Sequence, residues 1–135
     1  MRFVDTNVLL YSTSRDPSEG EKAARANELL TQRDLALSVQ VLQEFYVQAT
    51  RSTRDDPLTH EQASNLVQAF SRFPVQSTTL ALVQAAMASR NRYGIAYWDA
   101  AIIEAARLSG CDEILSEDLS TTQDYGGVFV TNPFV

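Results

Sequence analysis

The chain opens with Arg2-Phe3-Val4-Asp5-Thr6-Asn7-Val8-Leu9-Leu10-Tyr11, and this stretch decides the fold class. A first apolar run ends at Asp5, and a second one follows Thr6 and Asn7. This pattern predicts a buried strand that ends at Asp5, then a turn, then a helix capped at the Thr6-Asn7 turn. Ligands of open parallel sheets bind beyond the carboxyl ends of the strands. We therefore expect Asp5 at the mouth of a binding crevice.

The rest of the sequence alternates short apolar runs with longer amphipathic runs. Runs typical of strands lie at about 35–38, 73–75, 114–115 and 128–130, and runs typical of helices lie at about 19–32, 39–51, 59–70, 79–93 and 97–108. Strands that alternate with helices indicate an α/β fold, in which helices cover both faces of a parallel or mostly parallel sheet. Residues 1–135 are expected to form a single domain.

The composition is typical of a globular protein, since 44% of the 135 residues are apolar, 21% are charged and the net charge is −6. No window is apolar enough to span a bilayer, and the acid at position 5 does not fit a secretory signal. Cys111 is the only cysteine, so we expect no disulfide framework and a cytoplasmic setting. The negative charge argues against broad nucleic-acid binding by the bare surface. It does not exclude a nucleic-acid enzyme, because metal-binding carboxylates count as negative only while the metal is absent.

Four acidic residues are predicted to meet at the crevice edge of the sheet. Asp118 follows a predicted strand, as Asp5 does. Asp99 shares the apolar face of the helix at 97–108, where a carboxylate is costly unless it is paired or binds a metal. The alternative for this residue is a first-turn acid that satisfies free backbone N–H groups. Glu44 flanks the apolar stripe of its helix, so it too could reach the edge.

The chemistry of this set points to a hard divalent cation. Oxygen ligands without a cluster of histidine or cysteine favour Mg²⁺ or Mn²⁺ over Zn²⁺, and such a site suits hydrolysis of a phosphodiester. Polar side chains expected to hold the acids in place are Thr6, Asn7 and Ser116. Arginines expected to bind backbone phosphates are Arg51, Arg54, Arg90 and Arg92, with solvated helix ends as the alternative.

These segments together resemble the successive motifs of PIN domains, in order and with the usual spacing. The segments are Asp5-Thr6-Asn7, Ser38-Val39-Gln40-Val41-Leu42-Gln43-Glu44-Phe45-Tyr46, Tyr97-Trp98-Asp99-Ala100, Leu115-Ser116-Glu117-Asp118-Leu119 and Asn132-Pro133-Phe134. The chain most resembles the VapC-type toxins of bacterial toxin–antitoxin pairs. The resemblance implies a three-layer α/β/α sandwich with a mostly parallel central sheet of four to five strands.

The resemblance also implies an activity and partners. It implies a Mg²⁺-dependent ribonuclease that cleaves RNA, forms homodimers and is bound by a small antitoxin protein. By motif position it places the metal-ligating acids at Asp5, Glu44, Asp99 and Asp118. Two adjacent acids follow Ser116, and the sequence does not choose between Glu117 and Asp118 as the fourth ligand. The surface around Phe70, Phe73 and Tyr93 is the expected exposed surface for dimer contact.

Other α/β classes fit this sequence less well. A haloacid-dehalogenase-type phosphatase needs a second aspartate two residues on, where this chain has Asn7. A nucleotide-binding Rossmann protein needs a glycine-rich turn after the first strand, and Thr6-Asn7-Val8 has no glycine. A response-regulator receiver needs a lysine near the final strands, and the only lysine of this chain is Lys22. The remaining alternative is a non-catalytic PIN-like RNA-binding or assembly module. Degenerate members are expected to lose acids, and this chain keeps all four.

Overall fold

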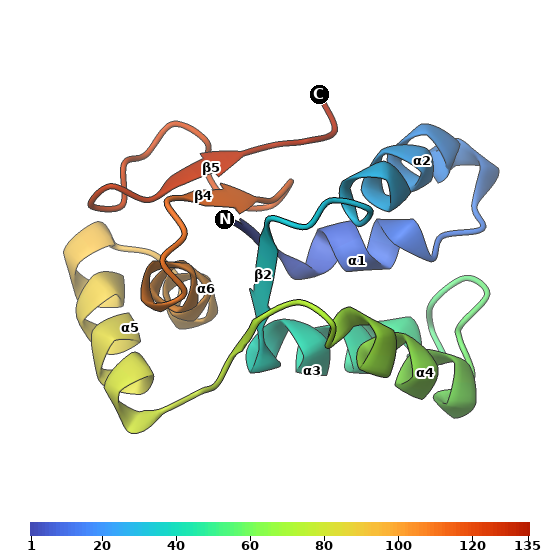
Figure 1. Ribbon diagram of the computed structural model, residues 1–135, viewed down its shortest axis with the longest axis horizontal. Coiled ribbons are helices and arrows are strands. Elements are labelled where there is room, and N and C mark those ends of the chain that lie inside the picture. The colour runs from blue at the N-terminus through green and yellow to red at the C-terminus, as the bar shows by residue number, and fades with distance from the viewer.

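The computed structural model describes all residues from Met1 to Val135 as five strands, six α-helices and one 3₁₀ helix (Figure 1). In chain order the elements are β1 (Arg2–Val4), α1 (Thr6–Ser12), the 3₁₀ helix η1 (Pro17–Glu19), α2 (Gly20–Leu29), β2 (Leu35–Ser38), α3 (Val39–Ala49), α4 (His60–Phe70), β3 (Val75–Gln76), α5 (Leu80–Tyr93), α6 (Tyr97–Leu108), β4 (Glu113–Leu115) and β5 (Phe129–Thr131).

The strands form one sheet in the order β3-β2-β1-β4-β5, and every neighbouring pair is parallel. Phe3 in the central strand pairs with Ala36 of β2 and with Ile114 of β4. Because all strands run the same way, their carboxyl ends meet at one edge of the sheet, which we call the site edge. The predicted α/β class is confirmed, and β3, which follows Pro74, is an edge strand as expected.

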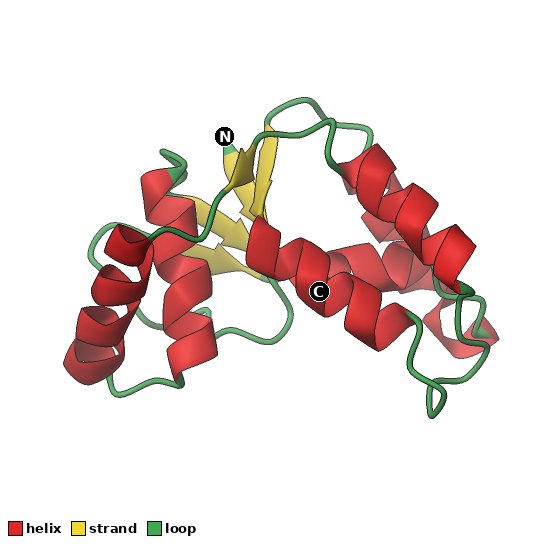
Figure 2. Cartoon of the chain, turned by 90° about the horizontal axis from the view of Figure 1, so that it is seen from below, coloured by secondary structure: helices red, strands yellow, loops and turns green.

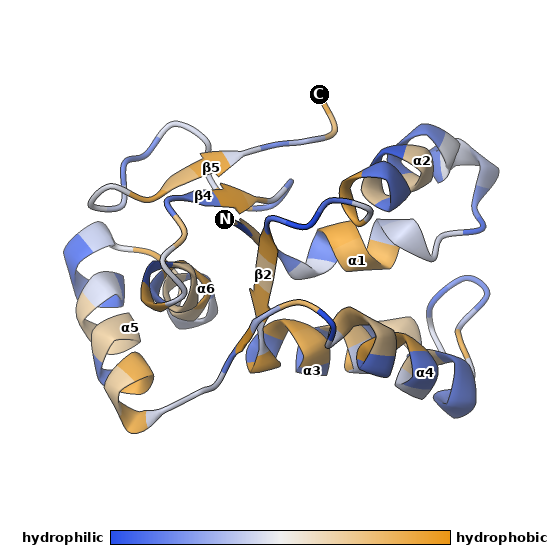
Figure 3. Cartoon of the chain, in the orientation of Figure 1, coloured by the Kyte–Doolittle hydropathy of each residue, from blue (hydrophilic) through white to orange (hydrophobic).

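Helices cover both faces of the sheet, which gives three layers. Figure 2 shows the strands between two groups of helices, and the labels of Figure 1 identify α5 and α6 on one side and α1 to α4 on the other. The hydrophobic colour in Figure 3 is strongest on strands such as β2 and β4. Phe3, Phe45, Ile103 and Ile114 are fully buried in the single core that the layers enclose. No helix is both long and apolar enough to cross a membrane.

Polar caps set most helix ends where the sequence predicts them. Thr59 and Gln62 form the expected capping box of α4, and Thr79 caps α5. Gly94 ends α5 in the left-handed conformation, with a φ of 65°, which glycine adopts without steric cost. One detail of the first turn is corrected. The strand β1 ends at Val4, and Asp5 itself caps α1 because its carboxylate accepts the hydrogen bond of the Thr6 N–H.

The expected dimer surface is wrong in part. Phe70 and Phe73 are only 4% and 7% exposed, because Phe70 packs edge-on against Phe45 at 5.2 Å between ring centroids and so joins α4 to α3. The large apolar side chains that remain exposed lie elsewhere, and they include Val47, Leu80, Met87, Trp98 and Leu108.

On α6 a half-buried arginine pairs with a buried glutamate and also binds the loop that precedes β5. Glu104 is 7% exposed, accepts a hydrogen bond from the Ser89 hydroxyl at 2.6 Å and pairs with Arg107 Nε at 3.0 Å. The same guanidinium donates to the carbonyls of Tyr125 and Gly126. Arg107 therefore neutralises a buried carboxylate and anchors the loop with one side chain.

Candidate active site

Asp5 lies at the site edge, between the end of β1 and the start of α1. Its side chain is almost buried, at 8% exposure. Oδ1 accepts a hydrogen bond from the Thr6 N–H at 2.8 Å, and Oδ2 accepts from the Ser116 hydroxyl at 2.7 Å and from Asn7 Nδ2 at 3.4 Å. Ser116 follows β4, the neighbour of β1, so the parallel pairing brings these two residues together.

Asn7 connects the acids of the two strand ends. Its Nδ2 group faces Ser116 Oγ at 3.1 Å and Asp118 Oδ2 at 3.3 Å. Its Oδ1 atom accepts the N–H of Glu117 at 3.2 Å. The fully buried Ser116 hydroxyl also accepts the N–H of Asp118 at 3.1 Å. The predicted supporting residues thus hold the acids in a hydrogen-bonded frame.

Glu44 reaches the same edge from α3. Thr6 donates its hydroxyl hydrogen to Glu44 Oε2 at 2.8 Å, and Gln40 Nε2 donates to Glu44 Oε1 at 2.8 Å. Gln40 also donates to the carbonyl of Trp98 at 3.2 Å, which connects α3 to the first turn of α6. Sequence reasoning missed Gln40. Its position four residues before Glu44, on the same face of a helix, was the available signal.

Asp99 lies in the first turn of α6 and differs from expectation in its burial. Ile102 and Ile103 on the same face are buried, but Asp99 is exposed, because this first turn lies at the site edge, beyond the core. Its side chain has no hydrogen-bond partner within the protein. Partial removal from water raises the pKa of Asp99, and the charges of Asp118 and Glu44 raise it further.

The pKa of Asp5 is the most strongly shifted at this edge. Burial raises it to about 6, the hydrogen bonds from Ser116 and Thr6 oppose the rise, and the charges of Glu44 and Asp118 add to it. The charges of Glu44 and Asp118 therefore act on both Asp5 and Asp99. No three acid, histidine or cysteine side chains converge tightly enough to form a ready-made metal cage.

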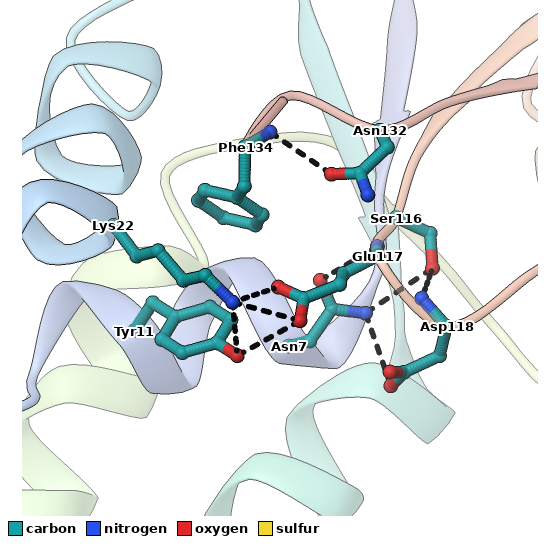
Figure 4. A network of polar contacts seen from close by, with 8 residues as sticks. All are labelled: Asn7, Tyr11, Lys22, Ser116, Glu117, Asp118, Asn132 and Phe134. Carbon is teal, nitrogen blue, oxygen red and sulfur yellow. Dashed lines mark hydrogen bonds and ion pairs between the residues drawn. The ribbon is translucent and has the colours of Figure 1, made fainter. Parts of the chain in front are cut away.

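The side chains of Glu117 and Asp118 point in different directions, as Figure 4 shows. The Glu117 carboxylate accepts hydrogen bonds from Lys22 Nζ at 2.9 and 3.1 Å and from the Tyr11 hydroxyl at 3.1 Å. The Asp118 carboxylate faces Asn7. Of the two adjacent acids, only Asp118 therefore faces the frame around Asp5.

Two of the four predicted arginines lie near the acids. A polar cleft of about 730 Å³ has Asn7, Asp118, Arg51 and Arg54 among its lining residues. Arg54 is held by the carbonyl of Ala49 and the hydroxyl of Thr13, both at 3.3 Å. Arg90 and Arg92, in the last turn of α5, do not line this cleft. They are exposed and fit the alternative of a solvated helix end.

Comparison with known proteins identifies the family. A family profile described as PIN domain matches residues 2–122. The chain belongs to the PIN domain family. This PIN domain is 30% identical to Ribonuclease VapC24 of Mycobacterium tuberculosis over 146 aligned positions, which cover 98% of this chain and 97% of that protein. The resemblance to VapC-type proteins, inferred from the motifs, is confirmed.

Solved structures share the fold of this PIN domain. A toxin–antitoxin complex from Klebsiella pneumoniae matches with a TM-score of 0.70 at 22% identity, over 99% of this chain and 98% of that one. The VapC20 toxin of Mycobacterium tuberculosis matches with a TM-score of 0.68 at 17% identity, over 87% of this chain and 90% of that one. These likenesses confirm the predicted three-layer architecture.

The donor set of this PIN domain fits a hard divalent cation. All the acids at the edge present oxygen atoms, which Mg²⁺ and Mn²⁺ prefer. Burial raises the pKa values of Asp5 and Asp99, and the charges of Glu44 and Asp118 raise them further. A bound cation would offset those charges. The residues that could hold it are Asp5, Glu44, Asp99 and Asp118.

The same electrostatics predict how stability depends on pH. The pKa of Asp5 is about 6 in the folded protein and 3.8 in the ordinary reference state. A raised folded pKa contributes stability that is present below about pH 4 and is lost as the pH rises through about 6. Ionisation of Asp5 should therefore lower the unfolding free energy of the metal-free protein by about 2–3 kcal/mol across this window.

Metal binding requires the ionised carboxylate, so the stabilisation by Mg²⁺ should grow over the same window. Thermal unfolding at several pH values, in EDTA and in MgCl₂ at matched ionic strength, measures both effects. We expect a small Mg²⁺-induced rise in Tm at pH 5 and a larger one at pH 7.5. If Mg²⁺ raised the Tm equally at both pH values, the raised pKa inferred for Asp5 would be contradicted.

Proposed function

We propose that this chain is the toxin of a toxin–antitoxin pair and acts as a Mg²⁺-dependent endoribonuclease that hydrolyses an RNA phosphodiester with water. One observation carries the proposal: four acids that are distant in sequence share the site edge, where desolvation and the charges of Glu44 and Asp118 raise the pKa values of Asp5 and Asp99. Support for the substrate class comes from the 30% identity to a protein named a ribonuclease.

The acids proposed to hold Mg²⁺, or Mn²⁺ in its place, are Asp5, Glu44, Asp99 and Asp118. When bound, the cation would supply activation of a water nucleophile and neutralisation of charge on the phosphate. Asn7 and Ser116 orient Asp5 and Asp118, and Thr6 orients Glu44. We propose Asp118 as the fourth ligand, because Lys22 already neutralises Glu117.

The polar cleft beside the acids is proposed to bind the RNA strand. Arg51 and Arg54 line it, and a guanidinium group can bind a phosphate through two hydrogen bonds. Arg51 is the stronger candidate, because Arg54 already donates to protein oxygens. The net charge of −6 suggests that such local contacts, and not the general field of the surface, guide the RNA.

The partners are proposed from the related proteins. One structural neighbour is a toxin–antitoxin complex, and another is described as a toxin that cleaves the sarcin–ricin loop. For this chain we propose a small antitoxin protein as the regulator, a homodimer as the assembly and the cytoplasm as the location.

The test is cleavage of a mixed cellular RNA pool by purified protein with Mg²⁺, with Mn²⁺ and with EDTA. Asp99→Asn is the informative variant, because Asp99 is exposed and makes no hydrogen bond that the fold needs. We expect metal-dependent cleavage that falls by at least about 100-fold in the variant. Glu61→Gln, which neutralises an exposed acid on α4, is the matched control and should cleave normally. Cleavage that persists in Asp99→Asn or in EDTA would contradict the proposal.

A second candidate function is a non-catalytic RNA-binding or assembly module. The absence of a ready-made metal cage favours it. A module of this kind should gain no stability from Mg²⁺ or Mn²⁺, whereas an acid site that binds a cation in the native state must gain stability. Thermal unfolding with and without the cation separates the two functions without an RNA substrate.

A further inference from the structure

Glu117 lies next to the site, but its charge is directed away from it. The carboxylate faces Lys22 on α2 and Tyr11 on α1, which lie side by side (Figure 4). Lys22 Nζ also donates to the Tyr11 hydroxyl at 3.3 Å and lies 4.9 Å from the centre of the Tyr11 ring. Phe134 packs edge-on against the same ring at 4.9 Å. Two helices therefore hold this carboxylate directly, through Lys22 and Tyr11, and Phe134 packs against the tyrosine.

The backbone of Glu117 belongs to the site even though its side chain does not. Its N–H donates to Asn7 Oδ1, and this contact decides which way the Asn7 amide faces. With Oδ1 committed to Glu117, the Nδ2 group must point toward Asp5, Ser116 and Asp118, as its contacts show. Restraint of the Glu117 side chain thus restrains the amide that orients two of the acids.

The charge balance gives the pairing a second effect. The edge already holds four carboxylates, and Asp5 has a pKa raised partly by its acidic neighbours. Lys22 is the only lysine in the chain. Without it, Glu117 would be a fifth carboxylate without a positive partner, one residue away from Asp118.

We propose that Lys22 is a positioning residue of this site. By pairing with Glu117, together with Tyr11, it keeps a fifth carboxylate out of the metal site and holds the Glu117 N–H on Asn7. The inference rests on the proposed ribonuclease activity for its catalytic readout. In this proposal Lys22 acts through Glu117, because its ammonium donates to Glu117 and Tyr11.

The proposal is tested with Lys22→Met, Glu117→Gln and the double variant. Lys22→Met should lower kcat about tenfold, the size typical of groups that orient metal ligands, with KM changed less than about twofold. It should also tighten Mn²⁺ binding, measured by titration calorimetry, because a carboxylate is released next to the site. In the Glu117→Gln background the Lys22→Met change should have almost no effect on either quantity, because no charge remains to be restrained.

Arg25→Met is the matched control, because it removes one positive charge from an exposed position of the same helix. It should leave kcat and Mn²⁺ affinity unchanged. If Lys22→Met lowers kcat equally in both backgrounds and raises KM, Lys22 binds RNA. If it changes only the Tm, Lys22 has a structural role. Either result overturns the proposal. If the wild-type protein binds Mn²⁺ but does not cleave RNA, the proposed function fails. The Mn²⁺ affinities of the wild type, the two single variants and the double variant still decide whether Lys22 restrains Glu117.

Discussion

Replacement of Asp5 by asparagine is expected to abolish RNA cleavage and to stabilise the metal-free protein. The two effects have opposite signs because the same charge is involved in both. The carboxylate is proposed to bind the cation, yet its burial costs free energy, which is why its pKa rises to about 6. Asparagine keeps the shape of the side chain and remains a good helix cap for the Thr6 N–H.

The expected sizes make the result easy to recognise. Cleavage should fall by at least about 100-fold, more than is usual for a side chain that only supports a metal ligand. At pH 7.5 in EDTA the unfolding free energy should rise by about 2 kcal/mol, which corresponds to a Tm higher by about 6 °C. Chemical and thermal unfolding provide these values, and the stabilisation by Mg²⁺ should disappear in the variant.

Asp16→Asn is the matched control for stability. Asp16 also caps a helical turn, through the Ser18 N–H, but it is exposed and its hydrogen bonds to Ser18 lower its pKa. The same substitution there should not stabilise the protein. An Asp5→Asn protein that is less stable than the wild type in EDTA would show that the hydrogen bonds to Asp5 outweigh its desolvation.

Replacement of Arg107 by methionine is expected to cause the largest loss of stability. The change would leave Glu104 charged, 7% exposed and paired only with Ser89, and would free the carbonyls of Tyr125 and Gly126. Removal of one partner of a buried ion pair typically costs about 3–5 kcal/mol. We expect about 3 kcal/mol, because the Arg107 side chain is itself 36% exposed. The Tm should fall by about 10 °C.

The control compares this pair with an exposed one. Arg2→Met removes the partner of Asp34, whose side chain is 52% exposed, and should cost less than about 1 kcal/mol. Addition of Glu104→Gln to Arg107→Met should recover part of the loss, because the unpaired buried charge is then removed. If urea unfolding showed that Arg107→Met and Arg2→Met lower the unfolding free energy equally, burial of Glu104 would not be what makes its ion pair important.

The sequence predicted well those features that depend on local pattern. A strand followed by an acid and a polar turn was enough to place Asp5 at the site edge, and the spacing of apolar residues located every helix. The ends of some helices differ by a few residues from those predicted, because local interactions set them. The 3₁₀ turn at Pro17–Glu19 precedes α2 in place of a helix starting at 19, and α3 ends at Ala49, before Arg51.

Features that depend on distant contacts were beyond the sequence. Lys22 and Glu117 are 95 residues apart, and no pattern near either residue indicates that they pair. The choice between Glu117 and Asp118 depends on that contact. The exposure of Asp99 likewise depends on how far α6 extends past the sheet, since an apolar helical face does not reveal where the core ends.

The position of β1 in the middle of the sheet has a consequence for synthesis of the protein. Asp5 is hydrogen-bonded to Ser116, 111 residues further along the chain, and β1 pairs with β4 in parallel. A nascent chain can form β1, α1 and β2 early, but its acids cannot assemble before residues 116–118 have emerged from the ribosome and folded back. Pairing over such a separation is also slow. A growing polypeptide therefore carries no complete site while it is still being translated through α6, which would delay the proposed ribonuclease activity until synthesis is almost finished.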